Sequence, residues 1–169
     1  MSDESALLSA IWEHPHEDTP RLVYADWLQE NGQPERAEFI SAQCELAQLD
    51  EWDESPRKAE LERREESLWK KHGKVWRTGL PSPLKVGMFR RGFPDPPEQS
   101  ATGKQFLAFP EVKLRAAPLW SFNLRQISDA EMGRIPTSGT LSRTDKFMVW
   151  EPTAAVTADA AERLVASPN

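Results

Sequence analysis

The stretch that decides the fold is Asp18-Thr19-Pro20-Arg21-Leu22-Val23-Tyr24-Ala25-Asp26-Trp27-Leu28-Gln29-Glu30-Asn31-Gly32. Thr19 can cap a helix whose first residue is Pro20. Proline is well suited to the first position of a helix, because the amide hydrogen that it lacks would have no partner within the helix. Asn31-Gly32 supplies the left-handed residue that ends such a helix. Large apolar residues occupy most of its circumference, which predicts a helix covered by neighbours on most sides.

Polar side chains within this helix therefore need partners. Asp26 stands between Ala25 and Trp27, so its carboxylate needs a partner if it is buried. Arg21 or a backbone amide group could donate the hydrogen bond. We expect Arg21, Tyr24, Asp26 and Trp27 to form a structural hub, in which Asp26 is an internal brace.

A wider pattern extends from this helix. The string from Thr19 to Leu28, followed by Arg36-Ala37-Glu38-Phe39-Ile40 and Gln43-Cys44, resembles the repeat-companion domain, a short helical segment of planctomycete and some myxobacterial proteins. The resemblance covers residues 4 to 48, and Arg91-Gly92-Phe93 is similar to a recurrent feature of the segment that follows. Such segments often precede leucine-rich repeats. The family defines no catalytic or ligand-binding residues, so the resemblance implies a helical module and no chemistry.

Composition narrows the class of protein. The chain has 169 residues, enough for one ordinary domain or two small ones, and a net charge of -6, which disfavours a nucleic-acid binder except within a larger complex. Its single Cys44 lies on an apolar face and is expected to be a buried, inert thiol. The sequence contains no apolar run long enough to span a membrane and no signal peptide, so we expect a cytoplasmic protein.

Helical periodicity and caps predict a four-helix module over residues 1–76. The expected helices run from Glu4 to Glu13, over the stretch quoted above, from Gln33-Pro34 onward, and from Ser55-Pro56 toward His72. Prolines and glycines then predict a joint over 77–117, with one or two short strands around 85–89 and a short helix over 99–109.

The tail, residues 118–169, resembles one or two degenerate leucine-rich repeats. Leu119–Leu124 and Thr144–Val149 fit the strand, and Ser128–Ile135 and Thr157–Ala166 the returning helices. The alternative is a plain α+β extension of the helical module. If the tail does consist of repeats, the chain is either a truncated repeat array or a solitary derivative of a longer ancestor. We then expect the N-terminal helices to cap the repeat solenoid.

Two clusters could carry chemistry. His14, His16, Glu17 and Asp18 are potential metal ligands. Tyr24, Asp26 and Glu30 could serve as acid and base groups, since Asp26 and Glu30 lie four positions apart on one helical face. No further motif for a metal, a nucleophile or a phosphate accompanies them, so we expect no catalytic residue, no metal and no cofactor.

Basic and aromatic residues suggest a binding surface instead. The candidate partner surface consists of Arg90, Arg91, Phe93, Trp120 and Trp150.

The sequence thus predicts an α+β protein, with a four-helix module followed by a short α/β tail. We expect a non-enzymatic protein-protein interaction module, an adaptor or scaffold, whose oligomeric state and partner stay open. Two alternatives remain: an accessory subunit of a larger protein or nucleoprotein complex, and a small metal-dependent hydrolase or nuclease that uses the acidic and histidine residues of the N-terminal helices.

Overall fold

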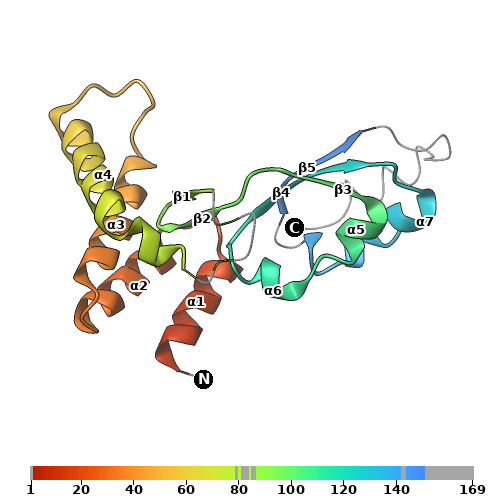
Figure 1. Cartoon of the computed structure of the whole chain (residues 1–169), viewed down its shortest axis with the longest axis horizontal. Helices are drawn as coiled ribbons and strands as arrows, with labels where there is room; N and C mark the ends of the chain where they lie inside the picture. The colour runs from red at the N-terminus through yellow and green to blue at the C-terminus, as the bar shows by residue number, and fades with distance from the viewer. Residues whose placement is uncertain (1, 79, 81–83, 85–86, 142–143, 151–169) are drawn as a thin grey trace. The chain divides into compact units, whose positions relative to one another are not determined.

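The computed structural model describes residues 2–78, 80, 84, 87–141 and 144–150. The chain forms two compact units, Met1–Asp95 and Pro96–Asn169, whose elements are labelled in Figure 1. The first unit is built mainly from helices and the second contains a three-stranded sheet, so the fold is α+β, as predicted.

Four helices open the first unit, as the sequence predicts. They are α1 (Asp3–Glu13), α2 (Thr19–Glu30), α3 (Pro34–Leu46) and α4 (Pro56–Trp76). The side chains of Ser2 and Ser55 accept hydrogen bonds from the first-turn amides of α1 and α4, and a proline stands in the first turn of α2, α3 and α4. These are the start signals that the sequence carries.

Two helix ends differ from the prediction. Asp18 and not Thr19 is the N-cap of α2, and it makes no capping bond because its carboxylate is engaged by Gln48 at 3.2 Å and by Arg91 at 3.4 Å. α4 continues beyond His72 to Trp76, so Gly73 lies inside the helix and does not end it. A Cβ at Gly73 would lie 2.8 Å from the ring of Trp69, so this position is closely packed.

A β-hairpin completes the first unit. β1 (Met88–Arg90) pairs antiparallel with β2 (Phe93–Asp95), and Arg90 lies opposite Phe93. The loop is therefore the two residues Arg91 and Gly92, whose φ angles are 48° and 84°. Positive φ at both positions is the hairpin turn that matches the twist of the flanking strands.

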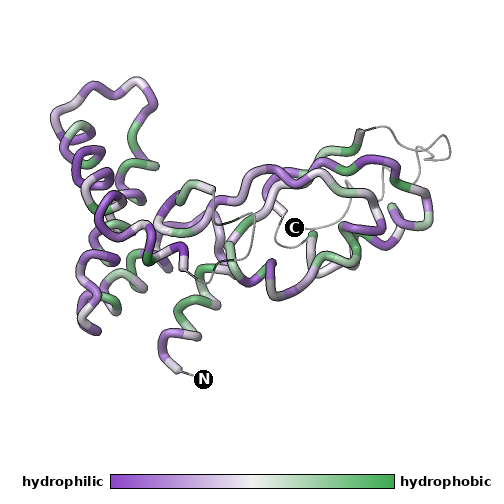
Figure 2. Tube along the Cα trace, viewed as in Figure 1, coloured by the Kyte–Doolittle hydropathy of each residue, from purple (hydrophilic) through white to green (hydrophobic). Residues whose placement is uncertain are grey.

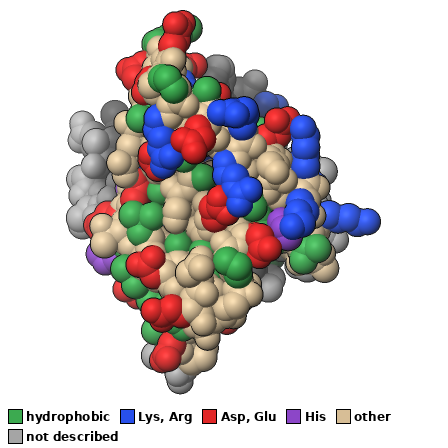
Figure 3. Space-filling model, turned by 90° about the vertical axis from the view of Figure 1, so that its left-hand side faces the viewer, with side chains coloured by type: hydrophobic (Ala, Val, Ile, Leu, Met, Phe, Trp, Pro, Cys, Tyr) green, Lys and Arg blue, Asp and Glu red, His purple; other side chains and the backbone are tan. Residues whose placement is uncertain are grey.

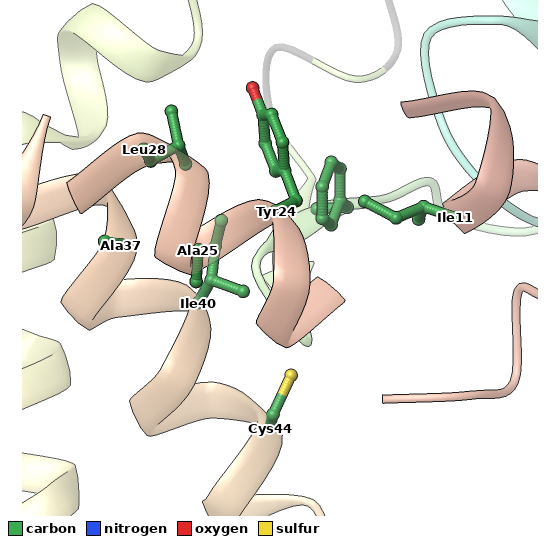
Figure 4. Packing of buried hydrophobic residues seen from close by; sticks show 8 residues of the cluster. Ile11, Tyr24, Ala25, Leu28, Ala37, Ile40 and Cys44 are labelled. Atoms are coloured by element: carbon green, nitrogen blue, oxygen red, sulfur yellow. The ribbon is translucent and has the colours of Figure 1, made fainter. Parts of the chain in front are cut away.

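The core of the first unit consists of two clusters. Figure 4 shows the larger one, in which side chains from α1, α2 and α3 meet; its buried members are Ile11, Tyr24, Ala25, Leu28, Ala37, Ile40, Cys44 and Phe93. The smaller one joins α3, α4 and β1 through Phe39, Leu68 and Phe89. Figure 2 shows that α4 is mostly hydrophilic, and it buries just Leu61, Leu68 and Gly73.

The second unit alternates strands with short helices. Its elements are β3 (Gln99–Thr102), α5 (Gly103–Leu107), α6 (Glu111–Leu114), β4 (Trp120–Arg125), α7 (Asp129–Met132), the 3-10 helix η1 (Ile135–Thr137) and β5 (Thr144–Trp150). The sheet order is β3-β4-β5, and both pairs are parallel. Gln99 pairs with Phe122 and Phe122 with Phe147, so partners are 23 and 25 positions apart in the sequence.

The strands predicted over 119–124 and 144–149 are present, whereas the helix predicted over 99–109 is partly wrong. Residues 99–102 form β3, because Thr102 caps α5 and its side chain accepts from the amide of Gln105. The helix predicted over Ser128–Ile135 divides into α7 and η1, and the one predicted over Thr157–Ala166 lies outside the described residues.

The boundary between the units lies inside the predicted joint of residues 77–117. The hairpin belongs to the first unit, because Phe93 packs into its core, and β3 belongs to the second, because it pairs with β4. Among the described helices, none is long and apolar enough to cross a lipid bilayer.

Candidate functional site

Arg21 is the buried cation of the predicted hub. It is 3% exposed, and its guanidinium donates to the carbonyl oxygens of Pro15 at 2.7 Å and Glu17 at 2.5 Å. Burial lowers the pKa of this guanidinium. Because both acceptors lie in the turn before α2, Arg21 fixes the connection between α1 and α2.

Tyr24 and Trp27 form the aromatic part of the hub. The Tyr24 hydroxyl donates to Oε1 of Glu4 at 3.1 Å, which links α2 to α1. Its ring stacks on Trp27 with centroids 5.9 Å apart and lies 6.0 Å from Phe93. Burial, and then the charge of Glu4, raise the pKa of Tyr24 to about 12.

The prediction that Asp26 is an internal brace is wrong. Its side chain is exposed, since Leu22, Val23 and Asp26 lie on a face of α2 that the described residues leave open. Leu22 and Val23 are 38% and 47% exposed. The carboxylate that does serve as a brace in this region is Asp18, the N-cap of α2.

The Arg90-Arg91-Gly92-Phe93 turn is anchored in the helical module. The amide of Gly92 donates to Oε1 of Gln43 at 2.7 Å, and Nε2 of Gln43 donates to the carbonyl of Phe89 at 3.1 Å and to Glu65 at 2.6 Å. Gln43 is 8% exposed. One buried amide side chain thus holds the hairpin against α3.

Arg36 is a half-buried cation, and sequence reasoning missed its role. Its guanidinium donates to the carbonyl of Gly92 and lies between 4.9 and 5.8 Å from the centroids of four rings, those of Phe39, Trp76, Phe89 and Phe93. Burial lowers its pKa to about 10. The ring faces stabilise the charge by cation-π attraction, so Arg36 joins α3, α4 and the hairpin.

Most of the predicted partner surface in the first unit is structural. Arg91 donates to the carbonyl of His16 at 2.6 Å, and Phe93 is 7% exposed because it fills the core beneath the turn. Phe93 is therefore not a partner contact, and the prediction was wrong there. Arg90 is exposed.

The second unit also overturns part of that prediction. Trp120 is 1% exposed, since it points to the inner face of β4 and packs on Phe109, with centroids 5.1 Å apart. The outer face of the sheet instead aligns Ser100, Asn123 and Met148 in one row. The side chain of Trp150 lies outside the described residues.

The predicted chemical clusters do not gather in one place. His14 pairs with Glu17 at 3.3 Å, on the surface. Within the described part of the chain, no group of three histidine, cysteine, aspartate or glutamate side chains is placed to hold a metal ion. Asp26 and Glu30 do share a groove, but neither His14 nor His16 lines it.

That groove lies between α1 and α2 and is the first candidate site. The α1–α2 groove has a volume of about 480 Å³ and is lined by Asp3, Ala6, Leu7, Val23, Asp26, Trp27 and Glu30. Its apolar members are Ala6, Leu7, Val23 and Trp27, and its carboxylates belong to both helices. No lysine or arginine lines it.

A second groove, between α3 and α4, has a similar volume of about 460 Å³ and a different electrostatic character. The guanidinium of Arg57 donates two hydrogen bonds, of 2.6 and 2.7 Å, to the carboxylate of Glu45, and Arg64 forms the same bidentate pair with Glu38. These hydrogen bonds lower the pKa of both glutamates. The charges of this second groove are thus satisfied internally, whereas those of the α1–α2 groove are not paired in this way.

Comparison of the chain with protein-family models, with curated proteins and with solved structures finds no match.

Proposed function

We propose that this chain is a non-enzymatic protein-protein interaction module, an adaptor or scaffold, that binds its partner in the α1–α2 groove. The observation that carries the proposal is the open apolar face of α2, where Val23 is 47% exposed and lines the groove together with Trp27. Exposed apolar surface that is continuous with a groove and rimmed by polar groups is typical of protein-binding sites. A cytoplasmic location is part of the same proposal.

The resemblance of the second unit to leucine-rich repeats also belongs to this proposal. Its support is the parallel order β3-β4-β5, with strand partners 23 and 25 positions apart, as their register gives. That spacing lies within the period of such repeats, which commonly serve as scaffolds for protein binding.

Affinity purification of the native protein tests the proposal. We expect a stoichiometric companion to co-purify with the natural chain and to be lost from Val23→Glu, which places a charge in the apolar lining of the groove. Ser67→Glu on α4 is the matched control, because Ser67 is exposed and lines the second groove. A companion that survives Val23→Glu would contradict the assignment of the groove.

A further inference from the structure

The charge of the α1–α2 groove indicates what kind of polypeptide it takes. Asp3 belongs to the first turn of α1, and Asp26 and Glu30 lie one turn apart on α2. All three side chains are exposed, and no ion pair ties any of them within the part of the chain that the structure describes. Among the described residues, the negative charges on both walls of the groove therefore have no ion-pair partner.

The apolar and acidic groups of the groove follow the spacing of a helix. On α2, Val23 and Trp27 are four positions apart, with Asp26 and Glu30 one turn and two turns beyond Val23. On α1, Asp3 is four positions from Leu7. Residues three and four apart share a helix face, so each wall sets carboxylates beside apolar side chains.

Charged side chains are unevenly distributed over the surface in Figure 3. On the face in Figure 3, Lys and Arg side chains lie in the upper part together with Asp and Glu, whereas the lower part carries Asp and Glu among hydrophobic side chains. An acidic partner would meet repulsion there, and a purely apolar one would leave the carboxylates without counter-charges.

We propose that the occupant of the α1–α2 groove is a basic amphipathic helix of a partner protein, with apolar side chains on Val23 and Leu7 and Lys or Arg side chains against Asp26, Glu30 and Asp3. This inference rests on the proposed function. An apolar groove between two helices is a common receptor for an amphipathic helix, whose anchors recur every three or four residues.

A peptide titration tests the chemistry of the occupant. The probe is a fluorescein-labelled synthetic helix of Leu, Lys and Ala with the leucines along one face, and its comparison peptide has Glu in place of every Lys. We expect the basic peptide to raise fluorescence anisotropy on binding and the acidic one not to. Binding of both peptides with equal affinity, or of neither, would overturn the inference.

Paired variants locate the binding. Asp26→Asn with Glu30→Gln removes two charges from the groove, and Glu62→Gln with Glu66→Gln removes two charges, also four positions apart, from the exposed face of α4. We expect the groove pair to weaken the basic peptide about fivefold at low salt and the α4 pair by less than about twofold. The difference should vanish near 1 M salt, because exposed charges are screened. Equal losses from the two pairs contradict the inference.

Two further outcomes separate this inference from the proposed function. If Val23→Glu loses the natural companion while the Asp26→Asn, Glu30→Gln chain keeps it, the groove binds a protein but not through its carboxylates. If the natural chain associates with itself in sedimentation and the groove pair abolishes this, the occupant is a second copy, and the inference is wrong. Far-UV circular dichroism shows whether each variant keeps its helices.

Discussion

The main-chain nitrogen of Gly92 donates a hydrogen bond to Oε1 of Gln43 at 2.7 Å, although the two residues are 49 positions apart. The carbonyl oxygen of Gly92 accepts a hydrogen bond from Arg36, so side chains of α3 bind both backbone polar groups of this residue. The hairpin is thereby a fixed part of the first unit.

Replacement of Gly92 by alanine should destabilise the first unit by about 2–4 kcal/mol. The residue has a φ of 84°, and a Cβ would lie 2.5 Å from Cγ1 of Ile40, so backbone strain and steric overlap add. Gly32→Ala is the control, because Gly32 has a φ of 76° with nothing within 4 Å and should lose about 1 kcal/mol. Urea denaturation followed by far-UV circular dichroism measures both, and equal losses would show that Gly92 is not closely packed.

Gln43→Leu should lower the free energy of unfolding by about 1–3 kcal/mol. The substitution keeps the approximate volume but leaves the buried amide of Gly92 without its acceptor, and an unsatisfied buried donor costs about that much. Gln48→Ala removes one exposed hydrogen bond, to Asp18, and should change stability by less than about 0.5 kcal/mol. The same denaturation experiment applies, and a neutral Gln43→Leu would mean that the hairpin does not depend on this contact.

The chain has one tyrosine, so its ionisation is directly visible by ultraviolet absorbance. We expect tyrosinate to appear with a midpoint near 12 in the folded chain, and near 10 in urea, because burial raises the pKa of Tyr24 to about 12. The folded-state pKa is the higher one. The stability that the protonated hydroxyl contributes is therefore complete below pH 10 and is lost as the pH rises to about 12. A folded-state midpoint at 10 would place Tyr24 in solvent.

Cys44 should react with Ellman's reagent only as fast as the chain opens. Its thiol is 1% exposed, and burial raises its pKa to about 12, so the reactive thiolate is scarce at neutral pH. The rate should rise when urea is added. Immediate reaction of the native chain would contradict the packing of Cys44 shown in Figure 4.

Local signals in the sequence were sufficient for the four helices of the first unit and for two strands of the sheet. Caps and prolines act within one turn, so Ser55-Pro56 predicts the start of α4 without any knowledge of tertiary structure. The strand β3 was missed because residues 99–102 gain their strand conformation from pairing with β4, which no local pattern reveals.

The errors about Asp26 and Phe93 have different physical causes. Residues adjacent in a helix point about 100° apart, so the apolar neighbours Ala25 and Trp27 say little about the burial of Asp26. Phe93 reaches the core because a hairpin distant in sequence folds onto α2 and α3. The aromatic surroundings of Arg36 arise in the same way, from rings of α3, α4 and the hairpin that periodicity cannot bring together.

The most direct test of the central claim is photo-crosslinking from position 23. Because Cys44 is buried, Val23→Cys offers a site for a benzophenone maleimide, and Ser67→Cys gives a matched site in the second groove. After illumination in an extract of the native cells, we expect one polypeptide to be crosslinked from position 23 in proportion to the bait and not from position 67. Equal yields from the two positions, or no adduct from position 23, would contradict the assignment of the α1–α2 groove as a protein-binding site.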